Sequence, residues 1–222
     1  MQFLIDDARL DRVERALNTF PLIGVTTNPS ILKVGGLTDF ERDLRTIREL
    51  VGDGDLHVQV VARDTEGMLR EADTIRELVG ESTLIKIPTT AAGLPAMRRL
   101  KAQGARVTAT AIYSTAQGLL ATAAGADYLA PYVNRMYNAD VDPYAVIRAL
   151  RQDIDREGVP TRILAASFKN VKQVTDAAAA GAHTATIGAD VLDAMLALPQ
   201  VESAVDAFAA DFQAAFSAPG IA

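Results

Sequence analysis

The chain has 222 residues, of which 49% are hydrophobic and 23% charged, so its composition is that of a folded globular protein rather than a disordered or fibrous one. It contains no cysteine and only two histidines, His57 and His183, which excludes disulfides, thiolate metal sites and a three-histidine zinc site. The net charge of −6 and the lack of a dense basic run argue against nucleic-acid binding.

Targeting signals are not visible in the sequence. The segment Met1–Asp7 has neither the basic region nor the long apolar region of a secretory signal. No apolar stretch reaches the roughly 18 residues that a membrane-spanning helix needs. We therefore expect a soluble cytoplasmic protein with no membrane partner.

Short apolar runs recur along the chain, and an amphipathic stretch follows each of them. The predicted strands begin near Gln2, Leu22, His57, Leu84, Arg106, Asp127, Arg162 and Thr184. Their spacing averages about 26 residues, the length of a strand, a loop and a three-turn helix. The sequence thus predicts eight strand–helix units.

The helical stretches carry their own boundary signals. Thr38–Glu41 resembles a capping box and predicts a helix through Leu50. Asp142 followed by Pro143 predicts a helix that runs to Glu157. Glycines stand where helices should end, at Gly80, Gly104, Gly125 and Gly158.

Eight such units favour a closed (β/α)8 barrel, an α/β TIM-barrel fold, formed as a single domain by residues 1–222. The alternative is an open doubly wound sheet, which usually has fewer strands. Such sheets often carry a glycine-rich phosphate-binding motif, and neither G-x-G-x-x-G nor a Walker A pattern occurs here.

One helix is left over after the eighth unit. Residues 201–217 carry an apolar stripe at helical spacing, formed by Val205, Phe208, Phe212 and Phe216. The helix could fold back across its own barrel or pack on a neighbouring subunit, and the residues alone leave both possibilities open.

Lys86 is the most unusual residue of the predicted strands. It lies in the apolar run Leu84–Pro88, and alternation turns Ile85 and Ile87 toward the helices and Lys86 into the barrel. A buried amine loses its proton more readily, and a neutral lysine can attack a carbonyl group.

Composition bears on the same residue. Only five of the 22 basic residues are lysines, so a chain that favours arginine uses a lysine where the proton must be shed. The alternative is a structural ion pair between Lys86 and a carboxylate such as Asp6.

Polar residues also gather at the carboxyl ends of the predicted strands, where barrel enzymes have their active sites. Alternation places these side chains at the mouth: Asp6, Thr26, Asn28, Gln59, Thr108, Thr110, Tyr132 and Ser167. Arg135, Ser167 and Lys169 could together bind a phosphate, or Arg135 could form a rim ion pair with Asp140 or Asp142. His57 begins a predicted strand and His183 precedes one, so we expect both at the amino end of the barrel in structural roles.

Four motifs, in order along the chain, resemble the transaldolase family and most closely its fructose-6-phosphate aldolase subgroup. They are Gly24–Ser30 (GVTTNPS), Ile85–Pro88 (IKIP), Pro131–Arg135 (PYVNR) and Ala165–Lys169 (AASFK). The resemblance covers essentially the whole chain. It implies a (β/α)8 barrel that acts on sugar phosphates as a class I aldolase, without a metal or an organic cofactor.

The resemblance also implies residue roles. Lys86 would form a Schiff base with the substrate, and Asp6 would assist proton transfer. Thr26, Asn28 and Asn134 would bind the substrate, and Arg135, Ser167 and Lys169 would hold its phosphate. A homo-oligomer, a decamer or pentamer, is implied too, with the C-terminal helix exchanged between neighbours.

Two positions distinguish the activities of the family. In the resemblance, transaldolases have glutamate in place of Gln59 and phenylalanine in place of Tyr132. Gln59, Thr110 and Tyr132 could instead hold a water that releases free dihydroxyacetone, which favours the aldolase. The alternatives are a transaldolase that transfers dihydroxyacetone between sugar phosphates and a non-catalytic sugar-phosphate binder.

Overall fold

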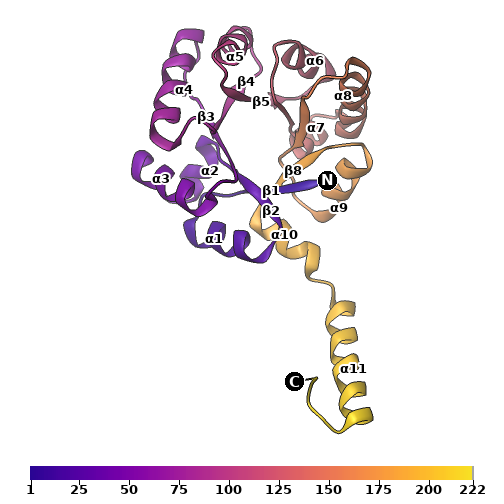
Figure 1. The fold of residues 1–222 in the computed structure, drawn as a ribbon. Helices are drawn as coiled ribbons and strands as arrows, with labels where there is room; N and C mark the ends of the chain where they lie inside the picture. The colour runs from indigo at the N-terminus through magenta and orange to yellow at the C-terminus, as the bar shows by residue number, and fades with distance from the viewer. Residues whose placement is uncertain (222) are drawn as a thin grey trace.

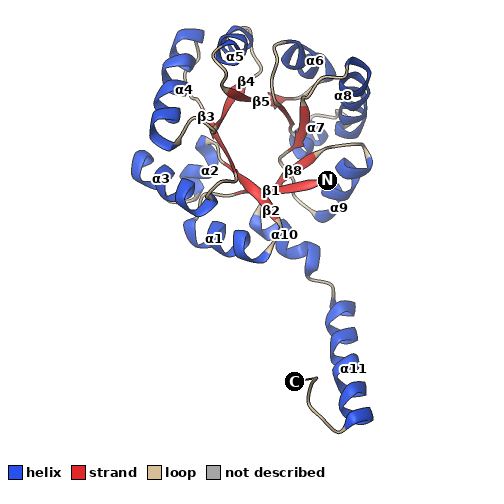
Figure 2. Ribbon diagram, viewed as in Figure 1, coloured by secondary structure: helices blue, strands red, loops and turns tan. Residues whose placement is uncertain are grey.

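A computed structural model describes residues 1–221 and contains a closed barrel of eight parallel strands in the order β1 to β8, with β8 pairing back to β1. Figure 1 shows the ring of strands with helices around it, and Figure 2 separates the two by colour. The strands are β1 (Gln2–Asp6), β2 (Leu22–Thr26), β3 (Asp55–Gln59), β4 (Leu84–Pro88), β5 (Arg106–Ile112), β6 (Tyr128–Pro131), β7 (Arg162–Ala165) and β8 (Thr184–Ile187). The predicted (β/α)8 barrel is confirmed.

In the described range, residues 1–221, eight helices cover the barrel and three more are additional. The covering helices are α1 (Leu10–Thr19), α3 (Phe40–Val51), α4 (Thr65–Val79), α5 (Gly93–Ala102), α6 (Thr115–Ala123), α8 (Pro143–Glu157), α9 (Val171–Ala179) and α10 (Ala189–Leu196). The short helices α2 (Pro29–Val34) and α7 (Val133–Asn138) follow β2 and β6 directly, and α11 (Pro199–Phe216) comes last. Both α2 and α7 begin at the carboxyl ends of their strands, the end where barrel sites form.

Helix boundaries follow the capping signals of the sequence. Asp142 caps α8 by accepting hydrogen bonds from the backbone amides of Tyr144 and Ala145, and Gly158 ends the helix in the left-handed conformation at φ 62°. At α3 the expected capping box is shifted by one residue. Asp39 is the cap, and the carboxylate of Asp43 accepts hydrogen bonds from the amides that precede the helix.

Apolar side chains fill the centre of the barrel. Leu4, Leu84, Tyr128 and Leu164 form a cluster separate from the core between strands and helices, and each is at most 4% exposed. Between β1 and β2 the register shifts, and Gly24 lies against the backbone carbonyl of Asp55, where a Cβ atom would be only 1.9 Å from that oxygen. Any other residue at position 24 would force β2 and β3 apart.

The amino end of the barrel is closed by polar contacts. Arg106 donates to the Asp55 carboxylate at 2.7 Å and the Tyr128 hydroxyl donates to it at 3.2 Å, while Arg162 donates to Gln2 at 2.6 Å. Arg106 and Asp55 are therefore paired, and Arg162 has a polar partner, where the interior meets solvent, an arrangement that limits the cost of burying these charges.

His57 lies deeper in the barrel than the sequence predicted. Strand β3 begins at Asp55, so His57 is its third residue rather than its first. The sequence did not predict this start, because Asp55 follows a Gly-Asp-Gly segment and resembles a turn residue. Its ring is fully buried, with Nδ1 2.8 Å from the Thr108 hydroxyl and one edge against Tyr128. His183 lies just before β8 as expected, where its Nδ1 accepts a hydrogen bond from the amide of Ile163.

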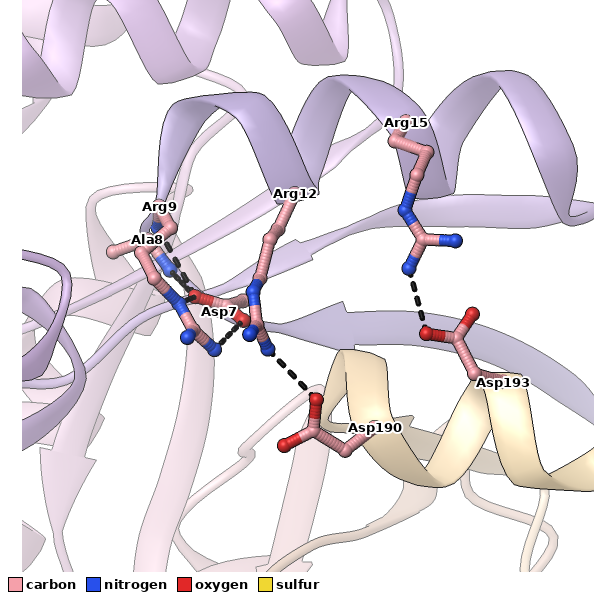
Figure 3. A network of polar contacts seen from close by, with 7 residues as sticks. All are labelled: Asp7, Ala8, Arg9, Arg12, Arg15, Asp190 and Asp193. Carbon is pink, nitrogen blue, oxygen red and sulfur yellow. Dashed lines mark hydrogen bonds and ion pairs between the residues drawn. The ribbon is translucent and has the colours of Figure 1, made fainter.

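Ion pairs join the first and last helices of the ring. Arg12 contacts Asp190 and Arg15 contacts Asp193, each at 2.7 Å, so α1 and α10 are linked beside the strand pair β1–β8 that closes the barrel (Figure 3). Such exposed pairs stabilise a fold by only about 0–1 kcal/mol each, so they contribute little to keeping the barrel closed.

Helix α11 projects away from the barrel (Figure 1) and has no buried residue. Val205, Phe208 and Phe216 are 59%, 71% and 68% exposed, so the stripe does not pack on its own barrel. Ala222, the last residue of the predicted domain, lies outside the described residues. No helix among residues 1–221 is long and apolar enough to cross a membrane.

Candidate active site

A cavity of about 390 Å³ opens at the carboxyl ends of the strands. Asp6 of β1 and Lys86 of β4 line it, with Arg135 on α7 and Ser167 after β7. Further lining comes from α2 and the amino end of α10. The cavity thus brings together polar residues that are distant in the sequence, at the end of the barrel where the strand alternation placed them.

Lys86 is buried to 4% exposure, and its side chain points into the barrel from β4. Its Nζ donates a hydrogen bond of 2.7 Å to the backbone carbonyl of Thr27. No carboxylate of residues 1–221 lies within 4 Å of that amine, so the simple ion pair with Asp6 is not formed. Burial lowers the pKa of the Lys86 ammonium, and the charge of Asp6 partly opposes this shift.

Asp6 stands across the same cavity at the end of β1. Thr26, its partner in register on β2, donates a hydrogen bond of 2.6 Å to Asp6 Oδ1. Burial raises the pKa of the Asp6 carboxyl, while Lys86 and the Thr26 hydrogen bond lower it. Thr26 is fully buried, so its hydroxyl serves Asp6 rather than the cavity.

Tyr132 and Thr110 form a hydrogen-bonded pair on the β5–β6 side. Their hydroxyl oxygens are 2.8 Å apart. A bulge in β5, with Ala111 at φ 56°, lies directly after Thr110, and beyond it the Tyr132 amide donates to the carbonyl of Ile112. Burial raises the pKa of the Tyr132 phenol, so it remains a proton donor at neutral pH.

Gln59 is placed apart from this pair. It is in register with Lys86, but it lines a neighbouring open cavity of about 540 Å³ beside Pro88 rather than the first one. Its Oε1 is buried and has no hydrogen-bond partner among residues 1–221. Of the expected group of three, only Thr110 and Tyr132 are hydrogen-bonded to each other, and Gln59 forms a hydrogen bond with neither of them.

Arg135, Ser167 and Lys169 line one side of the cavity. The Arg135 guanidinium lies over the Tyr132 ring, 4.9 Å from its centre, and donates to the Tyr113 hydroxyl at 3.3 Å. Among the described residues it has no carboxylate partner. Asp142, the alternative partner, caps α8 and lies 3.6 Å from Arg148 instead.

The loop after β7 is held in an unusual conformation. Ser167 has φ 64°, in the left-handed region that residues other than glycine rarely adopt. The amide of Asn134 donates to the Ser167 carbonyl and holds the loop against α7. The same loop carries Lys169, whose amide donates to Gln173, so these hydrogen bonds hold a cation and a hydroxyl together beside Arg135.

The two asparagines differ in placement. Asn28 lines the cavity while its Oδ1 caps α2 by accepting from the Ile31 amide, which leaves the amide nitrogen to face a ligand. Asn134 turns away from the cavity, since its Oδ1 accepts a hydrogen bond of 3.0 Å from Gln173 on α9.

Sequence reasoning missed several residues around the site. Gln173 is 8% exposed and binds both Asn134 and the Lys169 amide, so it orients the loop with the cations. Thr27 contributes only its carbonyl to Lys86, a role that any residue type could fill. Arg9 lines the cavity with its guanidinium on the buried Asp7 (Figure 3). Gln173 is the third residue of α9, three positions after the Asn170 cap, and this capping pattern was the signal available for it.

Together, the fold and the site define a (β/α)8-barrel protein with a buried lysine and a carboxylate in a cation-lined cavity at its carboxyl face. Residues 3–220 match the family described as Transaldolase/Fructose-6-phosphate aldolase. A "Probable fructose-6-phosphate aldolase" of Streptococcus pneumoniae (strain ATCC 700669 / Spain 23F-1) is 49% identical over 213 residues, which are 96% of each chain. The chain therefore belongs to the transaldolase/fructose-6-phosphate aldolase family and is an enzyme of the aldolase or transaldolase type.

A solved structure with low sequence similarity has the same fold. A (putative) lactate oxidase of Pediococcus acidilactici superimposes with a TM-score of 0.59 at 11% identity. The superposition covers 84% of this chain, and the chain spans 62% of that protein. At this identity the similarity supports the barrel fold and nothing about the chemistry.

Proposed function

We propose that this enzyme is a class I aldolase that reversibly cleaves fructose 6-phosphate to dihydroxyacetone and glyceraldehyde 3-phosphate. The observation that carries the proposal is Lys86, a buried amine without an ion-pair partner among residues 1–221 that faces a polar cavity opposite Asp6. Burial favours the neutral amine, which is the nucleophilic form, and the hydrogen bond to the Thr27 carbonyl fixes its direction.

These positions support the following covalent steps in the proposed reaction. The neutral Lys86 amine adds to the ketone carbonyl, and uptake of one proton from solvent with loss of water gives a protonated imine. The Asp6 carboxylate takes the proton of the C4 hydroxyl, the C3–C4 bond breaks, and its electron pair passes into the imine to form an enamine. The aldehyde product then leaves, and the three-carbon unit remains on Lys86.

Release of dihydroxyacetone needs a proton at C3 of the enamine and a water molecule to hydrolyse the imine. The Tyr132 hydroxyl lines the cavity with Lys86 and is ordered by Thr110. A protonated phenol in this position can hold and polarise a water molecule. Gln59 lines the neighbouring cavity beside Pro88, where its buried Oε1 is an acceptor with no hydrogen-bond partner among residues 1–221.

Arg135, Ser167 and Lys169 are proposed to hold the phosphate. Arginine binds phosphate with paired donors, and Arg135 is fixed between the Tyr132 ring and the Tyr113 hydroxyl. A phosphate held there would place the far end of the sugar at the rim and its carbonyl end toward Lys86. Asn28 would donate to a substrate hydroxyl.

We also propose that α11 packs on a second copy of this chain within a homo-oligomer. Phe208, Phe216 and Val205 are exposed on α11, and no residue of this helix is buried against the barrel. An exposed apolar stripe of this kind normally marks an interface.

The test is an assay of the purified enzyme with fructose 6-phosphate, with and without erythrose 4-phosphate as acceptor. An aldolase forms glyceraldehyde 3-phosphate without acceptor. Formation only with acceptor would show a transaldolase instead. No product under either condition would contradict the proposed reaction.

A further inference from the structure

Thr186 forms a hydrogen bond with Thr26, which in turn donates to Asp6, so the three side chains form a hydrogen-bonded series. It lies on β8 in register with Leu4 of β1, its side chain is 2% exposed, and its Oγ1 is 2.6 Å from Thr26 Oγ1. Thr26 Oγ1 is also 2.6 Å from Asp6 Oδ1. Strand β1 pairs with both β2 and β8, so the three side chains belong to three adjacent strands.

The number of hydroxyl protons determines which group donates in each of these hydrogen bonds. A threonine hydroxyl has one proton to donate, and an ionised carboxylate has none. Thr26 gives its proton to Asp6 and can only accept from Thr186. Among residues 1–221, the Thr186 hydroxyl has no other hydrogen-bond partner, so its proton can go only to Thr26. The reverse order would leave a buried hydroxyl proton without an acceptor, which is costly.

We propose that Thr186 is a positioning residue for the reaction: its hydroxyl donates to Thr26, locks the Thr26 proton onto Asp6 and so holds Asp6 as the carboxylate that accepts a proton during cleavage. This inference rests on the proposed function, in which Asp6 is the base.

The other groups that face Asp6 show what the hydrogen bonds from Thr186 and Thr26 contribute to its ionisation. Lys86 from β4 and Arg135 from α7 favour the carboxylate, while burial and the neighbouring Asp7 oppose it. The charge of Lys86 changes during the catalytic cycle as the amine, imine and enamine interconvert. Threonine hydroxyls do not titrate, so the two-step donor chain remains constant while the cation beside Asp6 varies. Chained hydrogen bonds also polarise one another.

The main variant is Thr186→Val, which removes the hydroxyl and keeps the shape of the side chain. We expect kcat for cleavage to fall about 3- to 10-fold, the usual effect of one lost hydrogen bond, with little change in KM. The acidic limb of the pH–rate profile should move to higher pH, because an Asp6 with weaker support is protonated more easily. Thr186→Ser keeps the hydroxyl and should restore the wild-type profile.

Thr184→Val is the matched control. Thr184 lies two residues earlier on the same strand, is fully buried, and donates to the Ile163 carbonyl instead of to Thr26. The same change of chemistry there should leave the acidic limb in place. A shift as large as that of Thr186→Val would mean that the effect comes from any polar loss in β8, and would overturn the proposal.

A titration of Asp6 by carbon-13 NMR of its carboxyl carbon separates this inference from the proposed function, because it needs no turnover. The midpoint should rise in Thr186→Val and remain at the wild-type value in Thr186→Ser and Thr184→Val. If Thr186→Val does not fold, Thr186→Ala must show the same rise. An unchanged Asp6 midpoint in Thr186→Val, or an equal rise in Thr186→Ser, refutes the role of the Thr186–Thr26–Asp6 hydrogen bonds. Absence of cleavage by the wild-type enzyme refutes only the proposed reaction.

Discussion

Tyr132→Phe removes one hydroxyl at the point where aldolase and transaldolase chemistry diverge. The ring should remain in place, because its contacts are the edge of Tyr113, 5.7 Å between centres, and the Arg135 guanidinium above it. What is lost is the 2.8 Å hydrogen bond to Thr110 and the donor to any water in the cavity. Imine formation at Lys86 does not require that donor.

The structure gives two separate magnitudes. Thr110 is fully buried and its hydroxyl has no other side-chain partner among residues 1–221, so leaving it unsatisfied should cost about 1–3 kcal/mol of stability. For a chain of this size that lowers Tm by roughly 2–4 °C per kcal/mol. Loss of a general acid–base group lowers rates by about 10²- to 10⁴-fold, so release of free dihydroxyacetone should fall within that range.

The assay compares release with transfer. Dihydroxyacetone formed from fructose 6-phosphate measures release, and the ketose formed with an added aldehyde measures transfer, which bypasses protonation of the enamine. The ratio of transfer to release should rise in Tyr132→Phe, and it should rise further when Gln59→Glu is added.

Tyr113→Phe is the control for this experiment. It removes a hydroxyl from the neighbouring ring. Within the part of the chain that the structure describes, the one hydrogen bond of that hydroxyl is with Arg135, so the ratio should remain unchanged. If Tyr132→Phe reduced release and transfer equally, Tyr132 would act in a step common to both, and Gln59 and Tyr132 would no longer distinguish the two activities.

Three further predictions concern stability, phosphate binding and assembly. Lys86→Met should abolish activity and raise the free energy of unfolding at neutral pH by about 1.4 kcal/mol for each unit by which burial depresses the lysine pKa. The destabilisation of the wild-type protein by buried Lys86 is full below the pKa of the folded state and disappears as pH rises to about 10.4, where the lysine of the unfolded chain also loses its proton. Urea titrations should therefore show a larger difference in unfolding free energy between Lys86→Met and wild type at pH 7 than at pH 10.5, and equal differences would contradict this reasoning. Arg135→Ala should raise KM for fructose 6-phosphate about 10- to 100-fold, as expected for a charged hydrogen bond, while leaving KM for an unphosphorylated aldehyde nearly unchanged; an equal rise for both would place the phosphate elsewhere. Replacing Phe208 and Phe216 by serine should reduce the assembly mass in light scattering, and an unchanged mass would refute an interface on α11.

The barrel was predictable because its signals are local and repeated. Each strand is a short apolar run, and in a parallel barrel the alternation of side chains decides which of them enter the interior. The alternation predicted that Lys86 enters the interior, and it is buried there. The end of α8 was also correct to the residue, since both Asp142 and Gly158 act through their own backbone neighbours.

Contacts made across the barrel were not predictable in the same way. His57 was placed too near the amino end because Asp55 resembles a turn residue until Arg106 is brought beside it by the fold. Gln173 and Thr186 act through partners that are far away in the sequence, and nothing in their local pattern indicates which side chain they meet. Gln59 satisfied the alternation, yet it lines a cavity beside Pro88 and Ala62 rather than the one that contains Lys86, and the alternation does not distinguish the two.

Trapping of the covalent intermediate tests the central claim most directly. The enzyme is incubated with fructose 6-phosphate or dihydroxyacetone and treated with borohydride, and the labelled peptide is identified by mass spectrometry. We expect inactivation, with a reduced three-carbon adduct on the peptide that contains Lys86, and no label in Lys86→Met. Label on Lys33, Lys101, Lys169 or Lys172, or full activity after borohydride treatment in the presence of substrate, would contradict a Schiff base at Lys86.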